Sequence, residues 1–233
     1  MNLTRLIPQP PLTIDTTADD AAARLEELYA SEATWLRINM IASLNGSAVG
    51  VDGTSNSLTS RVDRRILGAI RRQSDIVLVG ATSIRNEGYL MPRTAALAIV
   101  TASGDLEGNK IPADLAPGRL IVVCPSHAAA RVRNHLPDTV DIVETGDERP
   151  DAAGIVSALR DRGHRRIVCE GGPNLAAQLL DSGLVDELCL STSPLSVPSV
   201  LPVLPGQLPQ RLELTQLLAD DDGALYARWR VTR

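Results

Sequence analysis

The chain has 233 residues, of which 44% are hydrophobic and 22% charged, and its formal net charge is −5. This composition is typical of a globular domain, and a weakly acidic chain with scattered arginines is not expected to bind nucleic acid. The sequence contains no apolar run of about eighteen residues, and the opening MNLTRLIPQPPL lacks the apolar core of a signal peptide. We therefore expect no membrane association and a cytoplasmic location.

The cysteines and histidines do not form a recognisable metal motif. Each of the three cysteines lies in or beside an apolar, strand-like run, with no CxxC spacing, so we interpret them as reduced core residues. None of the three histidines begins an HExxH or HxE pattern. We therefore expect no metal site.

The predicted elements begin with two parts of unequal size. Residues 1–33 are expected to form an extended, proline-containing arm followed by a helix within 17–30, whose Leu25 and Leu28 face inward. Residues 34–233 are expected to form a single domain. It opens with a strand at 35–44, in which Leu36, Ile38, Met40 and Ala42 alternate with other residues.

A glycine-rich loop is predicted at 45–57, and a helix begins near Ser60, where Asp63 completes a capping-box-like pattern. Apolar strands then alternate with helical segments, which implies a mostly parallel sheet with helices on both faces. The strands are expected at 75–80, 95–101, 119–124, 140–145, 165–170 and 185–194, and the later helices at 127–136, 151–161 and 173–182. Residues 211–231 are predicted to form an antiparallel hairpin that closes one edge of the sheet.

The stretch CEGGPN, residues 169–174, is typical of a ligand-binding turn. Glu170 ends a strand, Gly171 and Gly172 allow close approach of another molecule, and Pro173 suits the first turn of a helix. Free N–H groups at such a helix start favour an anion such as phosphate. An isolated Gly-Gly is more often only a tight turn.

Other segments strengthen the phosphate interpretation. Ligands of open parallel sheets bind outside the carboxyl ends of the strands. Polar or glycine-rich segments follow the predicted strands after Leu44, Val79, Val100 and Cys169. These four segments are therefore expected to meet on one rim.

Several of these segments resemble a known family. NMIASLNG, AIRRQSDIVLVGATSIRNEGY and CEGGPNLAAQLLDSGLVDELCLSTSP are similar to the reductase domain of the RibD family of riboflavin biosynthesis, from about Leu36 to the terminal hairpin. The resemblance implies the dihydrofolate-reductase-like fold, a three-layer α/β/α arrangement. The family's deaminase half needs zinc-binding His/Cys motifs, which are not present here, so the chain is similar to a stand-alone reductase.

The resemblance implies an NADPH-dependent reductase that converts the ribose of a ribosylamino-pyrimidine phosphate into a ribityl chain. The nicotinamide half of the cofactor would lie near Ile41, Ala42, Ser57, Ser83 and Glu87. The other cofactor contacts would come from Gly171, Gly172, Pro173, Asn174 and Leu175 at the pyrophosphate, and from Thr101 and Ser103 at the adenosine 2′-phosphate. The preference for NADPH over NADH depends on these last two residues, so NADH is not excluded.

Four residues would face the substrate by the same resemblance: Ser55, Arg71, Arg93 and Glu170. The arginines would contact phosphate or the ring, and the carboxylate would accept hydrogen bonds. Each side chain also has a simpler interpretation. Arg71 suits a solvated helix end, Glu87 a turn cap, and the serines local turns. Of these residues Glu170 is the best candidate for catalysis.

The sequence also departs from the family pattern. Asn39 and Asn45 stand where relatives commonly have lysine and aspartate, so two charges expected near the substrate are absent, and Ala102 stands where relatives often have a basic residue. An NADP-binding protein without catalysis is therefore an alternative. A dihydrofolate-like or pterin substrate is another, although it would need a buried carboxylate. The family resemblance and the apolar LCLSTSPLSVPSVL also suggest a homodimer.

Overall fold

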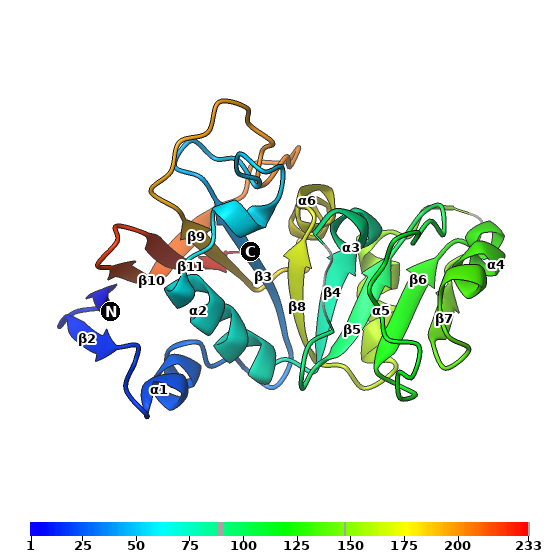
Figure 1. The fold of residues 1–233 in the computed structure, drawn as a ribbon, viewed down its shortest axis with the longest axis horizontal. Helices are drawn as coiled ribbons and strands as arrows, with labels where there is room; N and C mark the ends of the chain where they lie inside the picture. Colours follow the sequence, from blue (N-terminus) through cyan, green and yellow to red (C-terminus); the bar gives the residue numbers. More distant parts are fainter. Residues whose placement is uncertain (88–90, 147, 233) are drawn as a thin grey trace.

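The computed structural model describes residues 1–87, 91–146 and 148–232, which form one eleven-stranded sheet with helices on both faces (Figure 1). The strands are β1 (Asn2–Ile7), β2 (Leu12–Asp15), β3 (Trp35–Ala42), β4 (Ile76–Gly80), β5 (Ala96–Val100), β6 (Leu120–Cys124), β7 (Asp141–Glu144), β8 (Arg166–Gly171), β9 (Glu187–Thr192), β10 (Leu212–Asp220) and β11 (Leu225–Val231). The helices are α1 (Ala21–Leu28), α2 (Arg61–Arg72), α3 (Ala81–Glu87), α4 (Ser126–His135), α5 (Ala152–Arg160) and α6 (Pro173–Asp181), and η1 (Ser55–Ser57) is a 3₁₀ turn.

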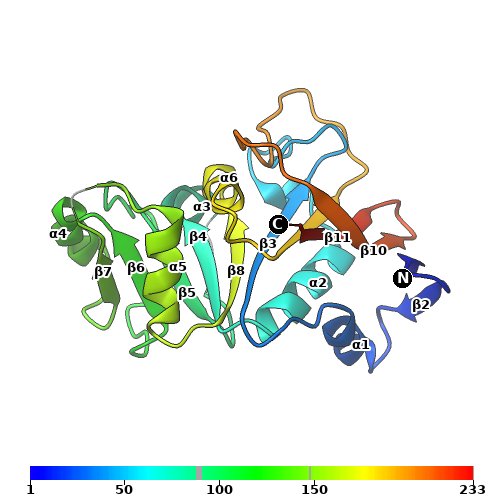
Figure 2. The same ribbon diagram turned by 180° about the vertical axis from the view of Figure 1, so that it is seen from behind.

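The strand order is β2-β1-β10-β11-β9-β3-β8-β4-β5-β6-β7. From β9 to β7 every neighbouring pair is parallel. Residues of α1 to α4 join the core on one face of the sheet, and residues of α5 and α6 join the core on the other. Figure 1 shows α2 in front of the sheet, and Figure 2, from behind, shows α5 in front. The predicted three-layer α/β/α fold is confirmed.

The sequence of strand β4 is apolar without interruption because both faces of the strand are covered. Ile76 and Leu78 enter the core beneath α5 and α6, whereas Val77 and Val79 enter the core beneath α2 and α3. All four side chains are fully buried. A strand covered on both faces needs apolar residues at every position, in contrast to the alternation expected of a half-exposed strand.

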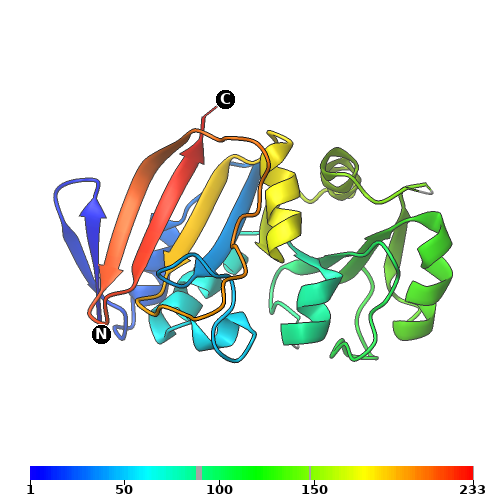
Figure 3. The same cartoon turned by 90° about the horizontal axis from the view of Figure 1, so that it is seen from above.

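The antiparallel end of the sheet differs from the prediction. The hairpin β10–β11 is present, but its expected place at the edge of the sheet was wrong, because β1 pairs with β10 and β2 pairs with β1. Figure 3 shows this N-terminal hairpin beside β10. The arm is held to the sheet by backbone hydrogen bonds and by the burial of Leu3 and Ile14. The pairing also covers the unpaired backbone groups that β10 would otherwise expose.

Helix α3 was not predicted. The segment after Val79 was expected only as a polar part of the rim, but residues 81–87 are helical and bury Ala81 and Ile84. The spacing of these two apolar residues, three apart, was the available signal. Because α3 follows β4 directly, it carries Thr82, Ser83 and Glu87 along the rim of the sheet.

Candidate functional site

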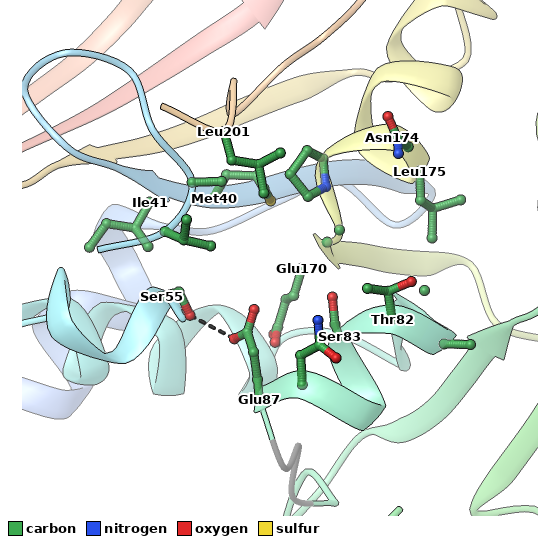
Figure 4. Close-up of a pocket in the computed structure, with 18 of the residues that line it drawn as sticks. Met40, Ile41, Ser55, Thr82, Ser83, Glu87, Glu170, Asn174, Leu175 and Leu201 are labelled. Atoms are coloured by element: carbon green, nitrogen blue, oxygen red, sulfur yellow. Dashed lines mark hydrogen bonds between the residues drawn. The ribbon is translucent and has the colours of Figure 1, made fainter. Parts of the chain in front are cut away.

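A cleft of about 1080 Å³ lies at the carboxyl ends of the parallel strands. Its walls include Ile41 at the end of β3, Gly80 at the end of β4, Val100 at the end of β5 and Glu170 in β8. Figure 4 shows Met40, Ile41 and Leu201 on one side of the cleft, with Ser83 and Glu87 of α3 opposite. The predicted convergence of segments on one rim is thus observed, and the volume is that of a small-molecule site.

The Gly171–Gly172 turn forms the centre of the cleft. Gly171 has a φ of +123°, a backbone conformation that favours glycine. A Cβ atom built on Gly172 would lie 3.5 Å from Ser83 Oγ, and one built on Gly80 would lie 3.5 Å from the Gly172 nitrogen. The main chains of β4 and β8 therefore approach closely here, and a ligand can reach bare backbone.

Helix α6 begins at this turn. Gly172 is its N-cap, and Pro173 occupies the first turn. Because glycine has no side chain, no side chain caps the start of the helix. The N–H groups of Leu175 and Ala176 donate to the Gly172 carbonyl at 3.0 and 3.1 Å. Asn174, the residue that precedes Leu175 in the first turn of α6, lines the cleft. The positive end of the α6 dipole consequently faces the cavity and favours a negatively charged group.

Arg71 and Glu170 form a bidentate ion pair in the wall of the cleft. Arg71 Nε donates to Glu170 Oε1 at 2.8 Å, and Nη2 donates to Oε2 at 2.6 Å. The Glu170 side chain is only 5% exposed and the Arg71 side chain 24%. A carboxylate so buried needs a partner, and Arg71 supplies it from the last turn of α2. The structure thus brings these two predicted residues together.

A second polar contact spans the cleft between the 45–57 loop and α3. The hydroxyl of Ser55 donates to Glu87 Oε2 at 2.6 Å (Figure 4). Both residues line the cavity. Gly88 and Tyr89, the end of the NEGY motif, lie outside the described residues.

Asp63 on α2 is a further carboxyl group in the cleft. Its N–H donates to the Ser60 hydroxyl at 3.1 Å, which confirms the predicted cap of this helix. Burial raises the pKa of Asp63, and hydrogen bonds from the hydroxyls of Ser191 and Thr59 offset part of that rise. The sequence indicated only its role at the helix start, because the capping pattern does not reveal which way the carboxyl group points.

The 45–57 loop is fastened to the connection after β9. The side chain of Asn45 donates to the Val197 carbonyl at 2.8 Å and accepts from the Val197 N–H at 3.1 Å. The N–H of Leu201 donates to the Ser47 hydroxyl at 3.1 Å. Asn45 therefore joins two loops and does not line the cavity, whereas Asn39 does. Of the two positions at which an expected charge is absent, only Asn39 lies in the wall of the cleft.

The outer end of the cleft contains Thr101 and Ser103, both predicted cofactor contacts. Their side-chain oxygens accept hydrogen bonds from the N–H groups of Gly104 and Asp105 at 3.0 and 3.3 Å. Arg149 lines the same cavity from the loop before α5, and no sequence signal singled it out.

Most of the predicted site residues line this single cavity: Ile41, Ser55, Arg71, Ser83, Glu87, Thr101, Ser103, Glu170, Gly171, Gly172, Pro173, Asn174 and Leu175. Ala42, Ser57 and Arg93 do not. Ala42 is buried within the β3–β9 ladder, where it pairs with Thr192. Ser57 donates to Asp52 Oδ1 at 2.6 Å within its own loop. Arg93 is exposed, and its carbonyl accepts from Arg119, the residue that precedes β6.

Among residues 1–87, 91–146 and 148–232, no group of three or more His, Cys, Asp and Glu side chains is arranged to hold a metal ion. Within the same residues, no helix is long and apolar enough to cross a bilayer.

Sequence comparison relates residues 34–226 to the RibD C-terminal domain, whose family model they match. The 2,5-diamino-6-ribosylamino-4(3H)-pyrimidinone 5′-phosphate reductase of Archaeoglobus fulgidus is 24% identical over 182 residues, which cover 69% of this chain and 80% of that relative. The riboflavin biosynthesis protein RibD of Chlamydia trachomatis is 23% identical over 190 residues, 76% of this chain. The match covers 51% of that RibD, so the chain spans about half its length.

Among solved structures, the fold is similar to that of a pyrimidine reductase-like protein from Corynebacterium diphtheriae. The TM-score is 0.79 at 24% sequence identity, and the superposition covers 90% of this chain and 99% of that protein. The deaminase/reductase of Thermotoga maritima has a TM-score of 0.71 at 18% identity, over 85% of this chain and 57% of that protein.

Proposed function

The chain belongs to the RibD C-terminal domain family, and from this premise we propose that it is an NADPH-dependent reductase of a ribosylamino-pyrimidine phosphate. The observation that carries the proposal is that one cleft, at the carboxyl ends of β3, β4, β5 and β8, is lined by most of the residues expected to contact cofactor and substrate. We take the reaction and the substrate class from the relatives that are named as reductases of a ribosylamino-pyrimidinone phosphate.

The cofactor would occupy the half of the cleft formed by α6, α3 and the end of β5. The Gly171–Gly172 turn fits a diphosphate, because a Cβ atom on Gly172 would fill the space beside Ser83 and the start of α6 has no side-chain cap. Thr101 and Ser103 would contact the adenosine 2′-phosphate, with Arg149 as a nearby cation. A bound dihydronicotinamide would supply the hydride.

The substrate would occupy the half of the cleft between α2, the end of β3 and the 45–57 loop. Glu170 and Arg71 would contact it as a fixed pair, with Ser55 and Glu87 closing the opposite side. Since the cofactor supplies the hydride, the main task of these side chains is to hold the acceptor carbon in position and to exclude water.

The direct test is an assay of NADPH oxidation with purified protein and 2,5-diamino-6-ribosylamino-4(3H)-pyrimidinone 5′-phosphate. We expect NADPH to be consumed, with a ribityl product, and NADH to react more slowly. NADPH binding without oxidation by this compound, its uracil counterpart or dihydrofolate would instead support the alternative of a cofactor-binding protein without catalysis. The uncharged Asn39 in the cleft wall is the feature that favours that alternative.

We also propose that the chain forms a homodimer. Several large apolar side chains are exposed on the loops beside the cleft, among them Leu44, Leu195, Val200 and Leu201. Exposed apolar groups gathered in one region are typical of an interaction surface. Light scattering coupled to gel filtration should give twice the chain's mass of 24.8 kDa, and Leu195→Ser with Val200→Ser should shift the protein towards the monomer. A monomeric wild-type protein would contradict the proposal.

A further inference from the structure

The carboxyl group of Asp63 is placed to contact a ligand, whereas the cap of its helix is made by the Asp63 N–H and the Ser60 hydroxyl. It lies in the first turn of α2, and Leu67 and Arg71 follow at four-residue intervals on the same face of the helix. All three residues line the cleft. The Asp63 carboxyl group therefore shares the face of α2 that carries Arg71.

The two carboxyl groups in this part of the cleft differ in their partners. Both oxygens of Glu170 are engaged by Arg71. Asp63 Oδ2 accepts from the Thr59 hydroxyl at 2.5 Å, and Ser191 also donates to the carboxyl group. Within the described residues, Asp63 has no guanidinium or ammonium group within 4.0 Å, although Arg64 lies next to it in the chain. Asp63 therefore retains accepting capacity that no basic side chain uses.

The preferred partner of such a group follows from its chemistry. The hydroxyls of Thr59 and Ser191 offset part of the burial that raises the pKa of Asp63, and the ionised carboxylate can only accept hydrogen bonds. Two adjacent N–H donors on a planar ligand would satisfy its remaining lone pairs in a bidentate contact. The N3–H and 2-amino group of a 2-amino-4-oxopyrimidine ring present this pair, and the same edge occurs in pterins.

We propose that Asp63 recognises the 2-amino, N3–H edge of a 2-amino-4-oxo heterocycle and rejects the corresponding 2-oxo, uracil-like ring. The inference rests on the proposed function and specifies its substrate class. A 2-oxo ring would place a carbonyl oxygen against the carboxylate, so two acceptors would face each other. The specificity would therefore come from a repulsive contact as well as from an attractive one.

The test uses matched ligand pairs that differ only at position 2. The pyrimidine pair is 2,6-diamino-4-hydroxypyrimidine and 6-aminouracil, and the pteridine pair is 6-methylpterin and 6-methyllumazine. Binding to the protein saturated with NADP⁺ is measured for the wild type, Asp63→Asn and Asp63→Ser. Asp151→Asn is the matched control, because Asp151 caps α5 outside the cleft.

We expect the wild type to bind the 2-amino member of each pair at least about tenfold more tightly than the 2-oxo member. A ratio of this size is typical of a hydrogen bond to a charged group. Asp63→Asn should lose that ratio and move towards the 2-oxo ligand, because an amide offers one donor and one acceptor. Asp63→Ser should bind both members equally, and Asp151→Asn should resemble the wild type. A stronger contrast in the pyrimidine pair would identify a pyrimidine substrate, and a stronger contrast in the pteridine pair a pterin substrate.

The inference would be overturned if folded wild-type protein showed no preference at position 2, or if Asp63→Asn kept the wild-type preference. Thermal unfolding of each variant shows whether it is folded, and Asp63→Ser repeats the test if Asp63→Asn is not. Failure of the proposed function has a different signature. NADP⁺ would then not bind, or NADPH would not be oxidised with any ring, whichever group stands at position 2.

Discussion

Single residues in the cleft are positioned by the strands and helices that end there. The sequence identified Glu170 and the two glycines because a strand, a turn and a helix start follow one another within a few residues. It could not show that Arg71, ninety-nine positions away, holds both oxygens of Glu170. Nor could it show that Asp63 faces the cleft or that Asn45 faces away from it, because local patterns do not specify side-chain direction.

The Arg71–Glu170 pair should matter for the substrate more than for the cofactor. Arg71→Gln leaves a carboxylate that is 5% exposed without its ionic partner. We expect KM for the pyrimidine to rise about tenfold and the free energy of unfolding to fall by about 1–3 kcal/mol, with Kd for NADPH little changed. Steady-state kinetics and urea titration measure these effects.

Arg72→Gln is the matched control. Arg72 is the next residue on α2, and it pairs with Glu26 on the surface, where the two side chains are 40% and 38% exposed. An exposed pair contributes less than about 1 kcal/mol. Equal effects of the two substitutions would contradict the role given to Arg71.

Gly172 should be required for coenzyme binding. Gly172→Val places a side chain beside Ser83 Oγ, where a Cβ atom alone would lie at 3.5 Å. Because the added methyl groups would enter the space assigned to the diphosphate, we expect Kd for NADPH to rise about tenfold or more, a loss of about 1.4 kcal/mol. Calorimetric titration of the folded variant measures this, and an unchanged Kd would refute the placement of the diphosphate.

Among the elements, the parallel strands and the β10–β11 hairpin were predictable, whereas the pairing of β1 and β2 beside that hairpin was not. The apolar runs that became β4, β5 and β6 are buried on both faces and therefore carry a strong sequence signal. The pairing of β1 with β10 joins segments more than two hundred residues apart, and no local pattern encodes such a partner. Helix α3 was missed because its seven residues provide only about two turns of periodicity.

A buried ion network fixes α1 to the centre of the sheet. Glu187 on β9 pairs with Arg37 on β3 at 2.5 Å and with Arg228 on β11 at 2.6 Å. Arg37 also donates to the Tyr29 carbonyl, at the end of α1, at 2.9 Å. Removing Glu187 would leave two guanidinium groups without an anion, so we expect Glu187→Gln to lower the free energy of unfolding by about 3 kcal/mol at neutral pH.

The effect of Glu187→Gln should depend on pH. Burial alone would raise the pKa of Glu187, but Arg37 and Arg228 outweigh burial and hold it below the ordinary value of 4.5. A carboxyl group whose pKa is lowered in the folded state makes its full contribution to stability when the pH is above its pKa in the unfolded chain. That contribution is lost as the pH falls through its pKa in the folded protein. The difference in stability between wild type and variant should therefore be constant above about pH 5 and shrink below 4.5. A constant difference down to strongly acidic pH would contradict this account.

At the scale of the whole molecule, the first fifteen residues are part of the sheet. The expected division into an arm with a helix, 1–33, and a domain, 34–233, lies close to where the family resemblance begins, at about Leu36. The structure places Leu3 in the core that α1 and α2 cover, with none of its surface exposed. Proline-containing sequence suggested an arm, whereas the backbone pairing of β1 and β2 and the burial of Leu3 and Ile14 show that the segment is structural.

The N-terminal hairpin should therefore contribute to global stability. Leu3→Ala removes a fully buried side chain, and we expect the free energy of unfolding to fall by about 2–4 kcal/mol. Leu6→Ala is the control in the same strand, because Leu6 is 38% exposed and its loss should cost less than about 1 kcal/mol. Chemical denaturation of both variants measures this. A Leu3→Ala protein as stable as Leu6→Ala would indicate that the hairpin is only loosely attached.

We propose that the Gly171–Gly172 turn and the start of α6 hold the diphosphate of a nicotinamide cofactor, with the substrate beside α2. The most direct measurement is a crystal structure of the protein grown with saturating NADPH. We expect the diphosphate to lie against the backbone of residues 171–174, the adenosine phosphate near Thr101 and Ser103, and the nicotinamide ring towards Glu170. Electron density for the coenzyme elsewhere, or a cleft without coenzyme at saturation, would contradict this proposal.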